Sequence, residues 1–186
     1  VRTLERVGVS AIVIEDKDEL KKNSLFDNQK NAKQDSIKSF CKKLKRASDS
    51  KISDDMLIVA RIESFILGKG IKDALKRAEM YSRSGADAIL IHSKEKNPKE
   101  IFKFSKQFMH NKYSKPLIAV PSTYSSVKES DLIKNGFKIV IYANHLLRSA
   151  YPAMKINAEK ILKNERTFEL EKKISSIKEV ISLIKE

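Results

Sequence analysis

The sequence has a single cysteine, no long apolar run and no segment that resembles a signal peptide. Cys41 cannot form an intramolecular disulfide, and its place among the apolar positions of a helical pattern favours a reduced core thiol over a nucleophile. No apolar run approaches the roughly 18 residues that a membrane-spanning helix needs. These absences predict a protein without disulfides or a membrane span, and we expect a cytoplasmic location.

The sequence also lacks the usual companions of nucleic-acid binding, although its formal net charge is +14. It contains no arginine-rich arm, zinc-finger spacing or aromatic-studded strand, and its lysines are spread over every predicted helix. Such a spread is typical of a lysine-biased composition and not of a dedicated phosphate-binding face. We therefore predict no nucleic-acid partner.

The first ten residues, VRTLERVGVS, lack an initiating methionine. Leu4 and Val7 have the spacing of an amphipathic helix that stops at Gly8. We therefore expect the sequence to begin within a secondary-structure element and to be a fragment.

After this opening, apolar strands alternate regularly with amphipathic helices. The predicted strands are 10–15, 56–62, 87–93, 116–122 and 138–144, and the predicted helices are 35–48, 71–85, 97–108, 126–136, 145–164 and 167–185. The first type of segment is a short apolar run and the second has apolar residues at helical spacing. Strands that are apolar on both faces and alternate with helices indicate a parallel sheet covered by helices.

Local signals refine several helix boundaries. Asn97 is expected to cap a helix whose first residue is Pro98, and Ser126 with Glu129 has the spacing of a capping box. Pro152 is expected to kink or break the helix in which it lies.

Polar residues at the ends of the strands decide between two parallel architectures. The five predicted strands end in Glu15–Asp16, Arg61 with Glu63, His92–Ser93, Pro121–Ser122–Thr123 and Asn144–His145. Functional groups at successive carboxyl ends are typical of a (β/α)8 TIM-type barrel, whereas a doubly wound sheet concentrates its signal in a glycine-rich loop. We predict an α/β barrel of which about five strands are present, in residues 1–164. A C-terminal amphipathic helix is expected in residues 165–186.

The chemistry of these strand ends suits a small polyanionic substrate. Arg61 could clamp a carboxylate or phosphate through its fork of donors, or it could simply pair with Glu63. His92 could be a buried core histidine or could point into a site and move a proton. Glu15 and Asp16 could bind Mg²⁺, but adjacent strand residues point in opposite directions, so only one can face the barrel mouth.

Four stretches of the sequence, matched in order, resemble the phosphoenolpyruvate mutase branch of the isocitrate lyase superfamily. These stretches are IEDKxxxKKNSL, IVARIESFILGKGIKDALKRAEMYSRSGADAILIHS, VPSTY and IVIYANHLLRSA. The resemblance implies a TIM-type barrel, a Mg²⁺ cofactor and a homodimer or homotetramer in which the C-terminal helix, residues 165–186, is exchanged between subunits. It also implies a small-molecule substrate, phosphoenolpyruvate or phosphonopyruvate.

The resemblance assigns a gate over the substrate to one segment of the chain. Its K-x-N-S-L pattern corresponds to Lys21, Asn23, Ser24 and Leu25. Lys21 and Asn23 would act in catalysis, and Ser24 and Leu25 would contact the substrate.

The resemblance assigns further roles to the strand ends. Glu15 would lie near Mg²⁺, through a water molecule, and Arg61 would bind the pyruvate end of the substrate. His92 would face the phosphoryl group that is transferred, and Ser122 would contribute to substrate binding.

The implied reaction moves a phosphoryl group from the enol oxygen of phosphoenolpyruvate to C3, which gives phosphonopyruvate. Since this equilibrium favours phosphoenolpyruvate in the family, a phosphonopyruvate decarboxylase is the implied pathway partner. The alternative is a phosphonopyruvate hydrolase, but Asn23 resembles the mutase gate, whereas hydrolases tend to carry threonine there. Thr123 departs from the lysine that mutases often have at this position.

A second alternative is an inactive truncated barrel that acts as an interaction module. The family's main Mg²⁺-binding aspartates and its Ser-Gly-Leu oxyanion loop have no counterpart in these residues. We therefore expect this fragment alone to be inactive. The catalytic cysteine motif of the carbon–carbon lyases is also missing.

Overall fold

The computed structural model describes residues 1–18 and 33–184. The chain forms two compact units, Val1–Tyr142 and Ala143–Glu186. Within the described ranges, no helix combines the length and apolarity that crossing a bilayer requires.

The first unit is built on a parallel sheet in which the strands follow one another in chain order. Its strands are β1 (Ala11–Glu15), β2 (Leu57–Ile62), β3 (Ala88–Ile91), β4 (Leu117–Ala119) and β5 (Phe137–Val140). Because each strand is added on the same side and parallel crossovers are right-handed, the connecting helices collect on one face of the sheet. This is the winding of a TIM-type barrel, whereas the strand order of a doubly wound sheet reverses.

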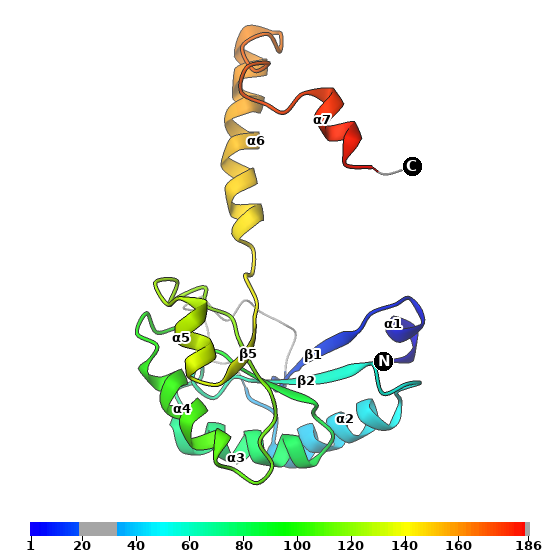
Figure 1. The fold of residues 1–186 in the computed structure, drawn as a ribbon, viewed down its shortest axis with the longest axis vertical. Coiled ribbons are helices and arrows are strands. Elements are labelled where there is room, and N and C mark those ends of the chain that lie inside the picture. The colour runs from blue at the N-terminus through cyan, green and yellow to red at the C-terminus, as the bar shows by residue number, and fades with distance from the viewer. Residues whose placement is uncertain (19–32, 185–186) are drawn as a thin grey trace. The chain divides into compact units, whose positions relative to one another are not determined.

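The helices of the first unit are α1 (Arg2–Arg6), α2 (Ile37–Asp49), α3 (Gly70–Arg83), α4 (Lys99–Met109) and α5 (Glu129–Lys134). Figure 1 shows α2, α3 and α4 along one face of the sheet. The core fills the space between these helices and the sheet.

Strand β2 illustrates how the sequence separates the two faces of the sheet. Ile58, Ala60 and Ile62 belong to the core beneath the helices. Arg61 lies between them in sequence and is therefore on the opposite face, since side chains alternate along a strand. The Arg61 side chain thus points away from the helical layer.

The expectation that all strands are buried on both faces holds only for the centre of the sheet. Every residue of β3 and β4 is buried, but β1 and β5 each have residues exposed to solvent. In the described sheet β1 and β5 are the edge strands, and an edge strand is covered by a neighbour on one side only. Val13 of β1 is 47% exposed for this reason.

Two of the predicted helix starts differ from the structure. Helix α4 begins at Lys99 with Pro98 as its N-cap, and Asn97 Oδ1 accepts a hydrogen bond from the Lys99 N–H at 3.0 Å. The asparagine therefore stabilises the start of the helix from one position earlier than expected. The predicted capping box of Ser126 and Glu129 is wrong, because α5 begins at Glu129 itself and has no side-chain cap.

The second unit contains α6 (His145–Asn164) and α7 (Ile177–Ser182). Helix α6 continues past Pro152, so the predicted break does not occur. The predicted continuous helix 167–185 is also wrong. The Ser176 hydroxyl accepts a hydrogen bond from the backbone N–H of Glu179 and caps the start of the short α7. Serine is a favoured N-cap because its hydroxyl can accept from the N–H groups of the first turn, which have no partner within the helix.

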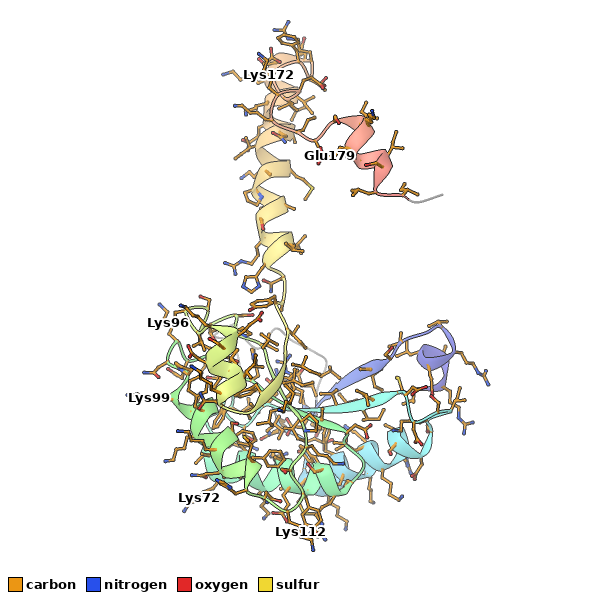
Figure 2. The ribbon with its side chains drawn as sticks, in the orientation of Figure 1. Lys72, Lys96, Lys99, Lys112, Lys172 and Glu179 are labelled. Atoms are coloured by element: carbon orange, nitrogen blue, oxygen red, sulfur yellow. The ribbon has the colours of Figure 1, made fainter. Side chains whose placement is uncertain are left out.

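The positive charge is distributed over several elements of the outer layer. Figure 2 labels Lys72 on α3, Lys99 on α4, and Lys96 and Lys112 in connecting segments, and all four are exposed. Their origin in separate elements agrees with the spread of lysines along the sequence.

Candidate active site

Charged side chains gather where β1, β2 and β3 end, on the face opposite the helices. The strand register pairs Glu15 with Arg61. Two residues further along each of the three segments, and therefore on the same face, are Lys17, Glu63 and His92. We call these five residues the strand-tip cluster. It brings together three of the predicted site residues, Glu15, Arg61 and His92.

Arg61 and Glu63 form a close ion pair inside this cluster. Glu63 Oε1 accepts a hydrogen bond from Arg61 Nε at 2.8 Å and lies 2.7 Å from Arg61 Nη2. The Glu63 side chain is fully buried. The pair therefore fixes the plane of the guanidinium group. Since a guanidinium has five donors, pairing with Glu63 is compatible with binding a substrate carboxylate.

Lys17 completes the charge balance of the cluster. Its Nζ lies 3.3 Å from Glu15 Oε1 and 3.5 Å from Glu63 Oε2, and its side chain is 3% exposed. Arg61 Nη2 is 3.8 Å from the same Glu15 oxygen. Two cations and two carboxylates therefore offset one another, which is the condition under which buried charges are tolerated.

In the sequence, Glu63 is predicted only as the alternative partner of Arg61, and Lys17 has no predicted role. One signal could have placed both residues in the site. Each lies two residues beyond a predicted site residue, Glu15 or Arg61, so each shares that residue's face if the extended chain continues.

His92 is almost fully buried, with 5% exposure. Burial, together with the nearby positive charges of Arg61 and Lys17, lowers the pKa of His92 to about 4, although the carboxylate of Glu63 opposes this shift. Among the described residues, its Nδ1 has no hydrogen-bond partner. At neutral pH the site therefore contains an uncharged imidazole that can donate one proton and accept another.

We expect the His92 imidazole to titrate near pH 4 in the folded protein, which can be measured by NMR of the ring carbon-bound protons. An unfolded histidine titrates near 6.5. The unfolded chain therefore takes up this proton first, and the contribution of His92 to stability is lost as the pH falls from about 6.5 to 4. The variant His92→Gln assigns the signal and should lose this part of the pH dependence. A midpoint at or above 6.5 would contradict the buried position.

The end of β4 is braced against the end of β3. Thr123 Oγ1 donates a hydrogen bond to the Ser93 carbonyl at 2.9 Å, and the Ser93 hydroxyl donates to Glu100. The predicted substrate-binding residue Ser122 is half-buried beside this brace, and its N–H donates to Val120 O at 2.8 Å. These contacts fix the backbone next to His92.

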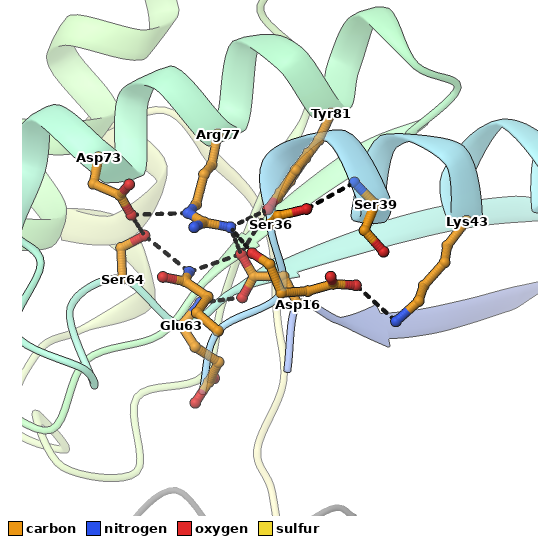
Figure 3. A network of polar contacts seen from close by, with 11 residues as sticks. Asp16, Ser36, Ser39, Lys43, Glu63, Ser64, Asp73, Arg77 and Tyr81 are labelled. Carbon is orange, nitrogen blue, oxygen red and sulfur yellow. Dashed lines mark hydrogen bonds and ion pairs between the residues drawn. The ribbon is translucent and has the colours of Figure 1, made fainter. Parts of the chain in front are cut away.

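The two adjacent acids at the end of β1 have opposite environments, as expected from strand alternation. Glu15 belongs to the strand-tip cluster, whereas Asp16 points into the helical layer and is fully buried. Figure 3 shows Asp16 beside Arg77 and Tyr81 of α3. Burial raises the pKa of Asp16 to about 6, against the hydrogen bonds that stabilise its charged form.

The described residues do not by themselves form a magnesium site. Among them, no three ligating side chains of histidine, cysteine, aspartate or glutamate come together. Glu15 offers one carboxylate, but Lys17 and Arg61 already lie close to its Oε1. Mg²⁺ prefers oxygen ligands in a near-octahedral arrangement, so Glu15 could supply only a minor part of such a site.

The predicted gate residues Lys21, Asn23, Ser24 and Leu25 lie outside the described residues. The chain on either side of them is held together. The N–H of Asp18 donates to the carbonyl of Lys33 at 2.9 Å, and Lys17 pairs with Gln34 in an antiparallel bridge.

The family model for phosphoenolpyruvate phosphomutase matches residues 1–162. The chain belongs to this family. It is 39% identical to a phosphoenolpyruvate phosphomutase of Tetrahymena pyriformis over 183 aligned residues. The alignment covers 98% of this chain and 60% of that protein. It is also 36% identical to a phosphonopyruvate hydrolase of Variovorax sp. (strain Pal2), with 96% of this chain and 61% of that protein covered.

Solved structures of the family confirm the predicted fold. The phosphoenolpyruvate phosphomutase from Streptomyces platensis subsp. rosaceus matches with a TM-score of 0.91 and 36% identity, over 98% of this chain and 62% of that chain. A phosphonopyruvate hydrolase in complex with oxalate and Mg²⁺ matches with a TM-score of 0.83 and 34% identity, over 96% and 60%. The chain therefore spans about 60% of the length of these family members.

Proposed function

We propose that the full-length protein interconverts phosphoenolpyruvate and phosphonopyruvate. The observation that carries this proposal is the Arg61–Glu63 pair beside the buried, uncharged His92 at the strand ends. Membership of the family supports it, because mutases are among the relatives with 31–39% identity.

In this reaction Arg61 would bind the carboxylate of the pyruvate moiety. A guanidinium binds a carboxylate through two parallel charged hydrogen bonds, which fixes the orientation of the substrate as well as its position. Glu63 holds the guanidinium from the side through Nε and Nη2. The pyruvate moiety would therefore be immobilised while the phosphoryl group moves.

The phosphoryl transfer breaks the bond between phosphorus and the enol oxygen and forms a bond between phosphorus and C3. The enol oxygen becomes the ketone oxygen of phosphonopyruvate, and no net proton is exchanged. A loose transition state of this kind requires positioning and charge stabilisation more than covalent catalysis. Uncharged His92, together with Asn23 and Lys21, would supply hydrogen bonds to the phosphoryl oxygens. Ser24, Leu25 and Ser122 would bind the substrate and help exclude water.

Mg²⁺ is proposed as the cofactor of the full-length protein, because a related hydrolase structure contains it together with oxalate. When bound, the ion would offset negative charge on the substrate oxygens. Glu15 would contribute one carboxylate, through a water molecule. We also propose that the protein is a homodimer or homotetramer and that a phosphonopyruvate decarboxylase consumes its product. The terminal segment 165–186 would be exchanged between subunits.

Hydrolysis of phosphonopyruvate to pyruvate and phosphate is the second candidate function. A relative with 36% identity is a phosphonopyruvate hydrolase, so overall similarity favours neither reaction strongly. The asparagine at position 23 supports the mutase, since threonine is the residue that the resemblance associates with hydrolases.

Phosphorus NMR of the full-length protein with Mg²⁺ and phosphonopyruvate distinguishes the two reactions. We expect the phosphonopyruvate signal to be replaced by that of phosphoenolpyruvate, and Asn23→Ala to slow this conversion by roughly 100-fold, the effect of losing one preorganised donor. Inorganic phosphate and pyruvate without phosphoenolpyruvate would instead identify a hydrolase. No turnover of either kind would contradict both functions and leave an interaction module.

A further inference from the structure

A closed ring of polar side chains lies on the helix side of the strand ends, across the sheet from the strand-tip cluster. Gln34 Nε2 donates to Asp16 Oδ2 at 2.8 Å and to Ser64 Oγ at 3.2 Å. Ser64 Oγ donates to Asp73 Oδ2 at 2.7 Å, and Arg77 Nε donates to the same oxygen at 2.8 Å. Arg77 Nη1 closes the ring at 3.2 Å from Asp16 Oδ2. Figure 3 shows four members of the ring, Asp16, Ser64, Asp73 and Arg77. We call these five residues the polar ring.

Tyr81 reinforces the charged part of the polar ring. Its hydroxyl lies between Arg77 Nη1, at 2.7 Å, and Asp16 Oδ2, at 2.8 Å. The side chains of Asp16 and Arg77 are 0% and 5% exposed. A buried ion pair of this kind is often no more stabilising than well-packed apolar residues. Its presence therefore suggests a role in fixing geometry.

The geometry that the polar ring fixes is that of the strand-tip cluster. Asp16 Oδ1 accepts the backbone N–H of Glu63 at 3.0 Å, and the Asp16 N–H donates to the Arg61 carbonyl at 3.1 Å. Asp16 is also the residue between Glu15 and Lys17. Asp16 therefore connects, through its carboxylate and its backbone N–H, the two strand ends that carry four charged residues of the cluster.

The polar ring also holds the chain where it returns at position 35. Arg77 Nη1 donates to the Asp35 carbonyl at 2.9 Å, and the Asp35 N–H donates to the Asp16 carbonyl at 2.9 Å. The ring thus connects three separate segments of the sequence with α3.

We propose that the polar ring and Tyr81 position Arg61, Glu63 and Lys17 for catalysis, so that Arg77, Tyr81 and Gln34 are positioning residues of the active site. This inference rests on the proposed function. None of the three contacts substrate in it. They act through Asp16, by keeping the ends of β1 and β2 in register, and displacements of about 1 Å at a site can lower rates 100-fold.

The test compares Tyr81→Phe and Gln34→Met with the wild type in the full-length protein. The control is Ser82→Ala, which removes a buried hydrogen bond from the same helix, 2.8 Å to the Ala78 carbonyl, at a position outside the ring. We expect kcat for phosphonopyruvate to fall about 10- to 100-fold in both ring variants, and oxalate to bind about tenfold more weakly in the presence of Mg²⁺. Ser82→Ala should change neither quantity by more than about twofold.

Amide hydrogen exchange separates positioning from general destabilisation. In the ring variants the Glu63 N–H should exchange at least about tenfold faster, because its acceptor Asp16 is less well held. The Ile89 N–H, bonded to the Pro116 carbonyl at 3.0 Å, should keep its wild-type rate. The inference would be overturned if both variants kept the wild-type kcat and the wild-type exchange rate of the Glu63 N–H. It would also be overturned if the Glu63 and Ile89 amide protons exchanged faster by the same factor. If the wild-type protein neither isomerises nor hydrolyses phosphonopyruvate, the proposed function fails. The oxalate affinity and the Glu63 amide exchange rate of the variants then still test whether the ring positions the strand-tip cluster.

Discussion

Replacing Arg61 with lysine is expected to lower kcat/KM for phosphonopyruvate by about 1,000-fold. Lysine keeps the positive charge beside Glu63, but a single ammonium group cannot form the two parallel hydrogen bonds that orient a carboxylate. Removing one preorganised donor at a reacting centre costs roughly 100- to 1,000-fold, and this change removes the pair of donors that orients the bound carboxylate, so we expect the upper end of that range. Steady-state kinetics of the full-length protein measures the effect.

Arg83→Lys is the matched control for this substitution. Arg83 lies near the end of α3, half exposed, with its guanidinium 4.9 Å from the centre of the Tyr113 ring. We expect kcat/KM to remain within about twofold of the wild type. Retention of activity within tenfold in Arg61→Lys, with the urea unfolding midpoint unchanged, would show that Arg61 does not bind the substrate.

The largest stability effect is expected for Arg77→Met, which should lower the free energy of unfolding by about 3–5 kcal/mol at pH 7. The change leaves the carboxylate of Asp16 buried without its cation. Uptake of a proton by Asp16 can relieve this, and burial has already raised its pKa to about 6. The folded chain therefore binds this proton more tightly than the unfolded chain, and the loss should be smaller at pH 5 than at pH 8. Urea denaturation at the two pH values measures it.

The double variant Asp16→Leu/Arg77→Met tests the cause of this loss. Since it removes both charges, it should regain a substantial part of the stability that Arg77→Met alone loses. The exposed pair of Lys45 and Asp49, 3.2 Å apart on α2, provides the surface comparison. Lys45→Met should cost far less than Arg77→Met, because exposed ion pairs are screened by water and salt. Equal costs for the two single variants would contradict the assigned burial of Asp16 and Arg77.

The sequence allowed the strands and their barrel winding to be predicted because both depend on local patterns. Short apolar runs such as the one in β3, bounded by turn residues and alternating with helices, favour buried strands, and repeated βα units permit few topologies. The site residues Glu15, Arg61 and His92 could be found for a related reason, since each is the first polar side chain on the outer face of its strand.

Other features depend on contacts between distant segments, which periodicity does not encode. Arg77 and Asp73 occupy polar positions of α3 that look solvent-exposed in the sequence, and only the fold brings Asp16 against Arg77 and Ser64 against Asp73. The buried Lys17 is a similar case, because the carboxylates that make its burial possible come from two strands. The end of the chain was mispredicted because Ser176 begins a helix where the isoleucine spacing alone suggests continuity.

The opposite orientation of Glu15 and Asp16 limits how the end of β1 can evolve. Because side chains alternate along a strand, one inserted or deleted residue within β1 would exchange the faces of the two acids. The carboxylate of Glu15 would then face Arg77 instead of Lys17 and Arg61, and the carboxylate of Asp16 would leave the polar ring and enter the strand-tip cluster. Since both changes would occur in a single mutational step, this part of the chain can vary in composition far more readily than in length.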